Sequence, residues 1–335
     1  MVDWPVTEPA RAATAAELVA ELLPTLRAFA IPMPVRFRGT TLRAGALLHG
    51  PAGWGEFSPF PEYGPRECAR WLGCAREAAA LGWPAPVRDS VPVNVTVPAV
   101  GPEQAHAIVA GSGCRTAKVK VAEPGQPESA DLARVEAVRD AIGPDGRVRV
   151  DANGGWDVPT AERMLAVLGA LDLEYAEQPC ATLGELAELR KRVDVPVAAD
   201  ESIRRAEDPL QVRAAEAADI VVLKVQPLGG VRSALRIAER CGLPVVVSSA
   251  VDTSVGLAAG IALAAALPVL EYACGLATIS LLAGDVTADP LTAVAGSVPV
   301  RPAVVDPDEL ARWEVDPSAW RDRLLAAAEF LPERL

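Results

Sequence analysis

Five short strings between residues 118 and 225 contain the side chains best suited to carry out chemistry. They are Lys118-Val119-Lys120, Asp151-Ala152-Asn153, Glu177-Gln178-Pro179, Asp200-Glu201-Ser202 and Leu223-Lys224-Val225. Each string ends an apolar, β-branched run that indicates a buried strand, and a helical segment follows each one. Charged side chains in a packed core are costly unless they are paired or bind a metal. The recurrence therefore predicts a polar site built from strand ends.

Three carboxylates, those of Asp151, Glu177 and Asp200, end three consecutive predicted strands. Parallel strands present their carboxyl ends side by side, so these acids are expected to be neighbours that repel one another unless a cation neutralises them. Ligation by oxygen atoms alone suits Mg²⁺, with Mn²⁺ as an alternative, rather than zinc. The other interpretation, a cap for the following helix, explains a single carboxylate better than three in succession.

Three lysines accompany the carboxylates. Lys118 and Lys120 are two residues apart and so share one face of a strand. If that face is the inside of a barrel, each ammonium disfavours the charge of the other, and one of them can act as a base near neutral pH. Lys224 lies on the sixth predicted strand, across the barrel from the second. The alternative, lysines that protect an exposed edge strand, does not suit a closed barrel.

A regular alternation of strands and helices positions these residues. The predicted strands are 91–97, 117–121, 147–151, 173–177, 195–200, 220–225, 244–249 and 269–272. Helical segments fill the gaps at 103–111, 128–142, 158–169, 182–192, 206–217, 231–241 and 255–266. This pattern predicts an α/β fold, a (β/α)7β modified TIM barrel over residues 91–280. Residues 1–90 are expected to form a small N-terminal α+β capping domain, completed by residues 281–335.

Composition narrows the class of partner. The net charge of −12 argues against nucleic acid and against an anionic membrane surface, but it does not exclude a small anionic substrate, because local lysines can dominate one cleft. Since a cation held between these lysines can bind a substrate carboxylate, the expected partner is a small-molecule carboxylate. The six cysteines show no metal-type spacing and the two histidines are scattered, which favours free thiols in a reducing cytoplasm. No secretory signal or membrane span is predicted, so a cytoplasmic location is expected. The sequence indicates no oligomeric state.

Taken together, the five strings resemble the enolase superfamily, in its muconate-lactonizing subgroup. The KxK of that family matches Lys118 to Lys120, its DxN matches Asp151 to Asn153, and its E-x-P matches Glu177 to Pro179. Its DES matches Asp200 to Ser202, and its sixth-strand lysine matches Lys224. The resemblance implies that a proton is removed from the carbon next to a carboxylate and that a bound divalent metal stabilises the negative charge that develops. This chemistry is well known for the enolase superfamily.

A narrower resemblance is to the o-succinylbenzoate synthase family in its actinobacterial form. The supporting strings are residues 30–33, 37–39, 53–60 and 247–250. The resemblance implies syn-dehydration of 2-succinyl-6-hydroxy-2,4-cyclohexadiene-1-carboxylate in menaquinone synthesis. In it Lys120 would remove the α-proton and return a proton to the departing hydroxyl, while Lys224 would stabilise the enediolate. The expected substrate contacts are Lys118, Asn153, Ser248 and Ser249, although the serines could equally cap the next helix.

Several alternatives stay open. An N-succinylamino acid racemase, or a dual-function enzyme, would use the same lysine pair on opposite faces of the α-carbon. A dipeptide epimerase is disfavoured because residues 270–277 lack a DxD string. Two further alternatives belong to other functional classes. One is a non-catalytic binding protein with a barrel fold, which the complete set of ligands and lysines opposes. The other is a Schiff-base aldolase, which needs no metal. The segment 54–60 either closes over the site as a loop or packs between the domains as an aromatic hinge.

Overall fold

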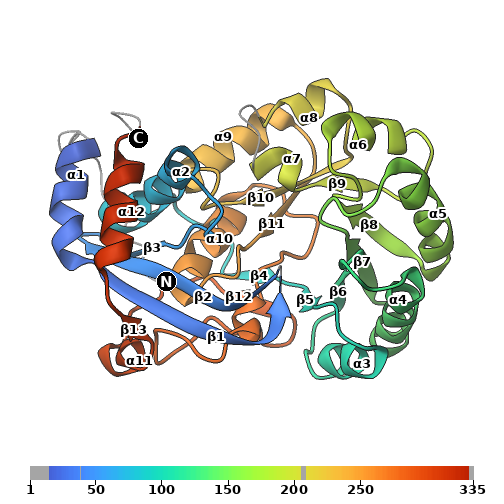
Figure 1. Ribbon diagram of the computed structural model, residues 1–335, viewed down its shortest axis with the longest axis horizontal. Coiled ribbons are helices and arrows are strands. Elements are labelled where there is room, and N and C mark those ends of the chain that lie inside the picture. The colour runs from blue at the N-terminus through green and yellow to red at the C-terminus, as the bar shows by residue number, and fades with distance from the viewer. Residues whose placement is uncertain (1–14, 38, 205–208, 332–335) are drawn as a thin grey trace.

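The computed structural model describes residues 15–37, 39–204 and 209–331. Its centre is a parallel sheet with the strand order β11-β10-β9-β8-β7-β6-β5, so that neighbours in the sheet are also neighbours along the chain (Figure 1). The strands are β5 (Val95–Val97), β6 (Thr116–Lys120), β7 (Arg147–Asp151), β8 (Leu173–Glu177), β9 (Val197–Ala199), β10 (Ile220–Lys224) and β11 (Val245–Ser248). Their apolar, β-branched composition follows from burial on both faces of the sheet.

Helices connect the strands and lie around them (Figure 1). They are α3 (Pro102–Ala110), α4 (Glu128–Ile142), α5 (Val158–Leu168), α6 (Leu183–Leu189), α7 (Glu201–Arg204), α8 (Gln211–Ala214), α9 (Val231–Cys241) and α10 (Ser254–Ala266). The helix α10 differs from the others because it is buried on all sides, with β11 of the barrel and β3 (Gly53–Phe57) both packed against it. Its Ala- and Gly-rich sequence suits this position, since small side chains allow close approach from every direction.

The barrel closes through a short eighth segment. Cys274 bridges to Val93 and Gly275 bridges to Ser248, both in parallel, which links the two edges of the seven-stranded sheet. The predicted strand at residues 269–272 is therefore wrong in position. Those residues form no strand, and the side chain of Val269 is 65% exposed, because the apolar run that suggested a strand lies at the surface before the chain enters the barrel.

The remaining elements form the capping part of the molecule. An antiparallel sheet has the order β13-β1-β2-β3 and is covered by three helices. Their bounds are β1 (Arg27–Phe37), β2 (Thr40–Gly50), β13 (Glu314–Val315), α1 (Ala15–Leu22), α2 (Pro65–Arg76) and α12 (Ser318–Ala328). Because α12 packs on α2 and buries Leu324, the C-terminal segment returns to the N-terminal one. The predicted fold class, a modified barrel with an α+β cap, is confirmed.

Some local predictions differ from the structure. The predicted strand 91–97 is two strands, β4 (Ser90–Pro92) and β5, and β4 pairs instead with β12 (Ser297–Pro299). All six cysteines are buried, and none of them forms a disulfide bond with another. None of the helices that the described ranges form combines the length and apolar character needed to cross a bilayer.

Candidate active site

The strand register brings the predicted residues together in rows. Lys120 of β6 pairs with Asp151 of β7, and Asp151 pairs with Glu177 of β8, so the three side chains stand side by side at the carboxyl ends of adjacent strands. On the far side of the barrel Lys224 of β10 pairs with Ser248 of β11 in the same way. One-residue register shifts would turn these side chains to the other face, so the pairing itself fixes the site.

The three carboxylates are buried almost completely. The exposed fraction is 1% for Asp151, 1% for Glu177 and 0% for Asp200. Asp200 directly follows β9 and precedes α7, and its backbone N–H donates to Oε1 of Gln178 (3.0 Å). Gln178, with φ of 39°, thus holds the end of β9 against the end of β8. Buried carboxylates this close require counter-charge, which the lysines provide.

Every one of the three carboxylates has a lysine partner. Lys118 Nζ lies 2.9 Å from both oxygens of Glu177 and 3.3 Å from Oδ2 of Asp151. Lys120 Nζ donates to Asp151 Oδ2 (2.5 Å), and Lys224 donates to Asp200. The chain has only four lysines, and these are three of them. Apart from Lys191, the lysines are therefore concentrated where a titratable, compact cation is useful.

The pKa shifts show how strongly the charges depend on one another. Burial, reinforced by the charge of Asp151, raises the pKa of Glu177 to about 7. Burial also acts to raise the pKa of Asp151, but Lys120 and Lys118 outweigh it and hold that pKa well below its usual range. For Lys118 burial is likewise outweighed, and Glu177 and Asp151 raise the pKa of the ammonium. Lys118 is therefore held charged by the carboxylates, whereas the sequence predicted that one of the two neighbouring lysines would lose its proton more easily.

A divalent cation fits the donor set at this place. Asp151, Glu177 and Asp200 supply only oxygen atoms, all buried, from three neighbouring strand ends. Within the described ranges no group of three acidic, histidine or cysteine side chains encloses a metal position in the present arrangement. The ammonium groups of the three lysines supply positive charge to the same carboxylates instead. The oxygen-only chemistry thus suits a hard cation, which would take over part of the role that lysine now fills.

A cavity opens directly onto these groups. Its lining residues are Phe37, Thr96, Lys118, Lys120, Asp151, Lys224, Ser248, Ser249, Val251 and Thr278. Lys120 and Lys224 reach it from β6 and β10, which three strands separate in the sheet, so they face the cavity from opposite walls. The serine Ser249 bonds Thr278 (2.6 Å between the hydroxyl oxygens), whereas Ser248 makes one long contact, 3.5 Å from its Oγ to the carbonyl of Gly275.

Asn153 does not line that cavity. Its Oδ1 accepts from Lys120 Nζ (2.6 Å), and its Nδ2 donates to Glu201 Oε1 (3.2 Å). Asn153 therefore orients Lys120 in this structure, a different position from the substrate contact that the sequence suggested. The left-handed backbone of Asn153, with φ of 47°, is one that asparagine tolerates better than most residues.

Sequence reasoning missed two residues at the site. Arg204 lies one helical turn after Asp200, with its Nε 3.2 Å from Oδ1, and it also bonds Tyr63 of the capping part. The i,i+4 spacing of Asp200 and Arg204 is a signal that could have revealed it. Phe37, whose ring centroid lies 5.1 Å from Lys120 Nζ, comes from β1, and no local pattern links it to β6.

Within the segment 53–60, residues 53–57 form the strand β3 and residues 58–60 follow it as a buried irregular stretch, so the segment is not an exposed loop. The rings of Phe57 and Phe60 are buried in the core of the capping part, with exposed fractions of 0% and 8%. From the same strand the carboxylate of Glu56 reaches the start of α10, where Oε2 accepts from the backbone N–H groups of Thr253 and Gly256 (3.1 Å each). This geometry supports the packed hinge between the two parts of the molecule.

Arg43 completes this contact between the capping part and the barrel. Its Nε donates to the carbonyl of Val251 (2.9 Å), and its Nη2 donates to Ser58 Oγ (2.8 Å) and lies 3.5 Å from Oδ1 of Asp252. Val251 lines the active-site cavity with φ of 61°, a strained value for a β-branched residue. We call Arg43, Glu56, Ser58, Asp252 and Thr253 the hinge cluster.

Comparison with known proteins agrees with this architecture. Residues 102–304 match the family described as "Enolase C-terminal domain-like", and residues 28–79 match "Enolase N-terminal domain-like". Among solved structures, a muconate lactonizing enzyme from Pseudomonas fluorescens covers 87% of this chain and 98% of its own, with a TM-score of 0.74 at 21% identity. An N-succinyl Arg/Lys racemase from Bacillus cereus covers 87% and 97%, with a TM-score of 0.71 at 20% identity. At these identities the likeness concerns the fold alone.

Curated relatives are much closer in sequence. An o-succinylbenzoate synthase from Thermobifida fusca is 72% identical over 303 residues, which are 90% of this chain and 96% of that protein. An o-succinylbenzoate synthase from Mycolicibacterium smegmatis is 56% identical over 311 residues, 91% of this chain and 96% of that protein. The likeness therefore extends over both the capping part and the barrel.

Proposed function

The chain belongs to the o-succinylbenzoate synthase family of the enolase superfamily, and we propose on that basis that it dehydrates 2-succinyl-6-hydroxy-2,4-cyclohexadiene-1-carboxylate to o-succinylbenzoate. The observation that carries the proposal is the cavity between Lys120 and Lys224, which Asp151 also lines, with Glu177 and Asp200 buried at the neighbouring strand ends. A site of this kind offers a base on one wall and a cation on the other.

In the proposed reaction Lys120 removes the proton next to the substrate carboxylate. The same ammonium, still on the same face, then returns a proton to the departing hydroxyl, so that water leaves by syn-elimination and the ring becomes aromatic. Because Asn153 and Asp151 both accept from Lys120 Nζ, they fix the position from which it acts. A neutral amine is needed for the first step, so Lys120 must lose a proton before or as substrate binds.

The other two lysines have different proposed roles. Lys224, on the opposite wall, stabilises negative charge that develops on the substrate as the proton leaves. Lys118 keeps Glu177 and Asp151 in place, since its ammonium contacts both carboxylates. When Mg²⁺ or Mn²⁺ is bound by Asp151, Glu177 and Asp200, it supplies further positive charge next to the substrate carboxylate. Ser248, at the end of β11, is proposed to bind the succinyl tail, whereas the hydroxyl of Ser249 is engaged with Thr278 and with the N–H of Val251.

An ultraviolet assay tests the proposal directly. Purified protein with Mg²⁺ is expected to consume the diene absorbance of the cyclohexadiene carboxylate, and EDTA is expected to abolish the activity until excess Mg²⁺ restores it. Lys120→Met should be inactive, while Lys191→Met, which changes the one exposed lysine, should equal the unaltered protein. A folded, metal-loaded protein that leaves the diene unchanged would refute the synthase assignment.

A second activity is compatible with the same geometry. Because Lys120 and Lys224 face one cavity from opposite walls, they could exchange the α-proton of an N-succinylamino acid on its two faces. Incubation of N-succinyl amino acids in D₂O tests this racemase reaction. Deuterium at the α-carbon together with loss of optical rotation would establish it, and the absence of both would leave dehydration alone.

A further inference from the structure

A second cavity, away from the strand-end site, is lined by four arginines, and none of the described residues that line it is acidic. Its volume is about 450 Å³, which is within the usual range for small-molecule pockets. Its lining residues are Arg66, Ala69, Arg70, Gly73, Arg76, Pro209, Leu228, Gly229, Ser233, Arg236, Ile237, Phe330 and Leu331. In a chain with 44 acidic and 32 basic residues, such a one-sided lining is unexpected.

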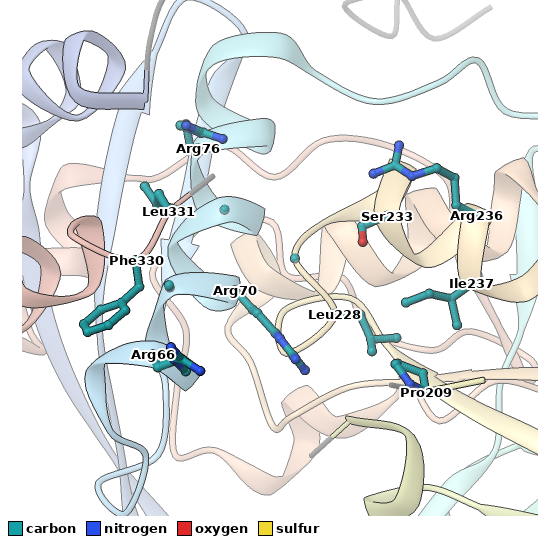
Figure 2. A pocket seen from close by; sticks show the side chains of 13 residues that line it. Arg66, Arg70, Arg76, Pro209, Leu228, Ser233, Arg236, Ile237, Phe330 and Leu331 are labelled. Atoms are coloured by element: carbon teal, nitrogen blue, oxygen red, sulfur yellow. The ribbon is translucent and has the colours of Figure 1, made fainter. Parts of the chain in front are cut away.

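Two helices from different parts of the molecule form the walls of this cavity. Arg66, Arg70 and Arg76 come from one face of α2 in the capping part, and Arg236 comes from α9 of the barrel (Figure 2). Between the helices the side chains are small. A Cβ added to Gly73 would lie only 3.5 Å from the carbonyl oxygen of Gly229, so the chains approach closely at the floor of the cavity.

The most informative residue is Arg76. Its side chain is 1% exposed, yet its Nε and Nη2 atoms have no hydrogen-bond partner. A buried guanidinium without a partner is costly, because its charge and its donors have lost water and gained nothing in exchange. Among the described residues no ion pair joins Arg76 to a carboxylate, and it lines the cavity, where an anion could reach it.

The acidic residues that adjoin Arg76 and Arg66 are engaged elsewhere. Glu77 turns to the start of α9, where its carboxylate accepts from the backbone N–H groups of Val231 and Arg232 (2.5 and 3.1 Å). Glu67 accepts from the backbone N–H of Gly64 (3.3 Å) at the start of α2. Neither carboxylate lines the cavity, and none of the described residues that do so is acidic.

We propose that this cavity binds a small polyanion that carries phosphate or carboxylate groups and spans α2 and α9. Guanidinium groups match the oxygens of either group with paired hydrogen bonds, and several of them together favour more than one anionic group. The apolar side chains of Leu228, Ile237 and Phe330 accommodate a hydrocarbon part of such a ligand. Because the walls belong to the capping part and to the barrel, a bound anion would join the two.

Calorimetric titration tests this proposal with pyrophosphate and citrate as probes. The titrations are made at constant ionic strength and with EDTA present, so that chelation of metal does not contribute to the heat. Saturable binding of one equivalent is expected, and the preference between the two probes identifies phosphate or carboxylate as the favoured group. Binding should also raise the melting temperature by a few degrees, since the ligand binds only the folded state.

Two variants assign the binding to the cavity. Arg76→Met and Arg236→Gln should each weaken the binding at least tenfold, and Arg76→Met should not lower the melting temperature of the free protein, because it removes a buried charge that has no partner. Arg240→Gln, also on α9 but outside the cavity, is the matched control and should bind normally. Unchanged binding in both cavity variants, or no saturable binding of either probe, would overturn the proposal. Lys120→Met should bind the probes normally, which separates this site from dehydration.

Discussion

The strand-end site and the hinge cluster are both buried groups of charge, but they are balanced differently. At the strand ends three lysines face three carboxylates, and every carboxylate has an ammonium partner. In the hinge cluster one arginine, Arg43, serves two carboxylates, and the hydroxyl of Ser58 and the start of α10 supply the hydrogen-bond donors to Glu56. In the strand-end site the carboxylates are balanced by flexible lysine side chains, whereas in the hinge cluster they depend largely on fixed backbone donors.

This difference appears in the pKa values and indicates what each group does. Burial raises the pKa of both carboxylates of the hinge cluster, Glu56 (to about 7, helped by the charge of Asp252) and Asp252. At the strand ends the pKa of Glu177 is also raised to about 7, but the lysines hold the pKa of Asp151 well below its usual range. Lysine side chains can move aside when a metal and a substrate arrive, because each has a flexible stem and one compact charge. The backbone N–H groups of Thr253 and Gly256 cannot. The strand-end site is therefore suited to chemistry and the hinge cluster to fixing the cap on the barrel.

The largest expected effect comes from removing the proposed base. Lys120→Met should lower kcat/KM for the cyclohexadiene carboxylate by roughly 10⁴-fold, because it removes proton transfer while Lys118 still pairs with Asp151. The measurement is the ultraviolet assay, with circular dichroism to verify the fold. If the variant kept most of its activity, the contrast between a catalytic and a structural cluster would be lost.

Breaking the hinge cluster should affect stability more than chemistry. Arg43→Met leaves Glu56 and Asp252 without their shared cation, and we expect the free energy of unfolding to fall by about 3–5 kcal/mol. Urea denaturation measures this loss. The matched control is Arg27→Met, which breaks the exposed pair with Glu314 between β1 and β13 and should cost less than about 1 kcal/mol. Equal losses in the two variants would contradict the role assigned to the hinge cluster.

The two groups also differ in how far the sequence could predict them. Asp151, Glu177 and Asp200 follow strands at regular intervals, so strand periodicity alone brings their backbones to one edge of the barrel. Glu56 and Thr253 are 197 residues apart, and no local pattern connects a strand of the cap with the start of α10. Phe37 reaches Lys120 for the same non-local reason. Pairings that depend on how two parts of a chain dock are fixed by packing, which a single sequence does not display.

The pH dependence of stability gives a smaller effect with a defined sign. In the folded protein the pKa of Glu56 is raised from 4.5 to about 7, so the folded state retains a proton that the unfolded state loses. Stability contributed by this proton is present below pH 4.5 and is lost as the pH rises to about 7. Relative to Glu56→Gln, the unaltered protein should lose roughly 3 kcal/mol between about pH 4.5 and 7.5, then level off.

Urea titrations across this pH range provide the measurement. The Gln variant keeps an oxygen that can accept from Thr253 and Gly256, so it reproduces the protonated state of Glu56. An exposed carboxylate on α9, changed in Glu239→Gln, serves as the control and should run parallel to the unaltered protein. A constant difference between the unaltered protein and Glu56→Gln would show that Glu56 does not titrate in this range.

The smallest expected effects distinguish structural from functional roles within the cavity itself. The hydroxyl of Ser249 bonds Thr278 and accepts from the N–H of Val251 (3.2 Å), so Ser249→Ala should lower stability by about 1 kcal/mol through the strained turn at Val251. Ser248 makes only a long contact to Gly275, which leaves its hydroxyl available to substrate. Ser248→Ala should therefore raise KM about fivefold with stability unchanged. The reverse pattern, a raised KM in Ser249→Ala and a lowered stability in Ser248→Ala, would assign substrate binding to Ser249. The substrate would then lie close to the hinge cluster, because Ser249 is two residues before Val251, whose carbonyl accepts from Arg43.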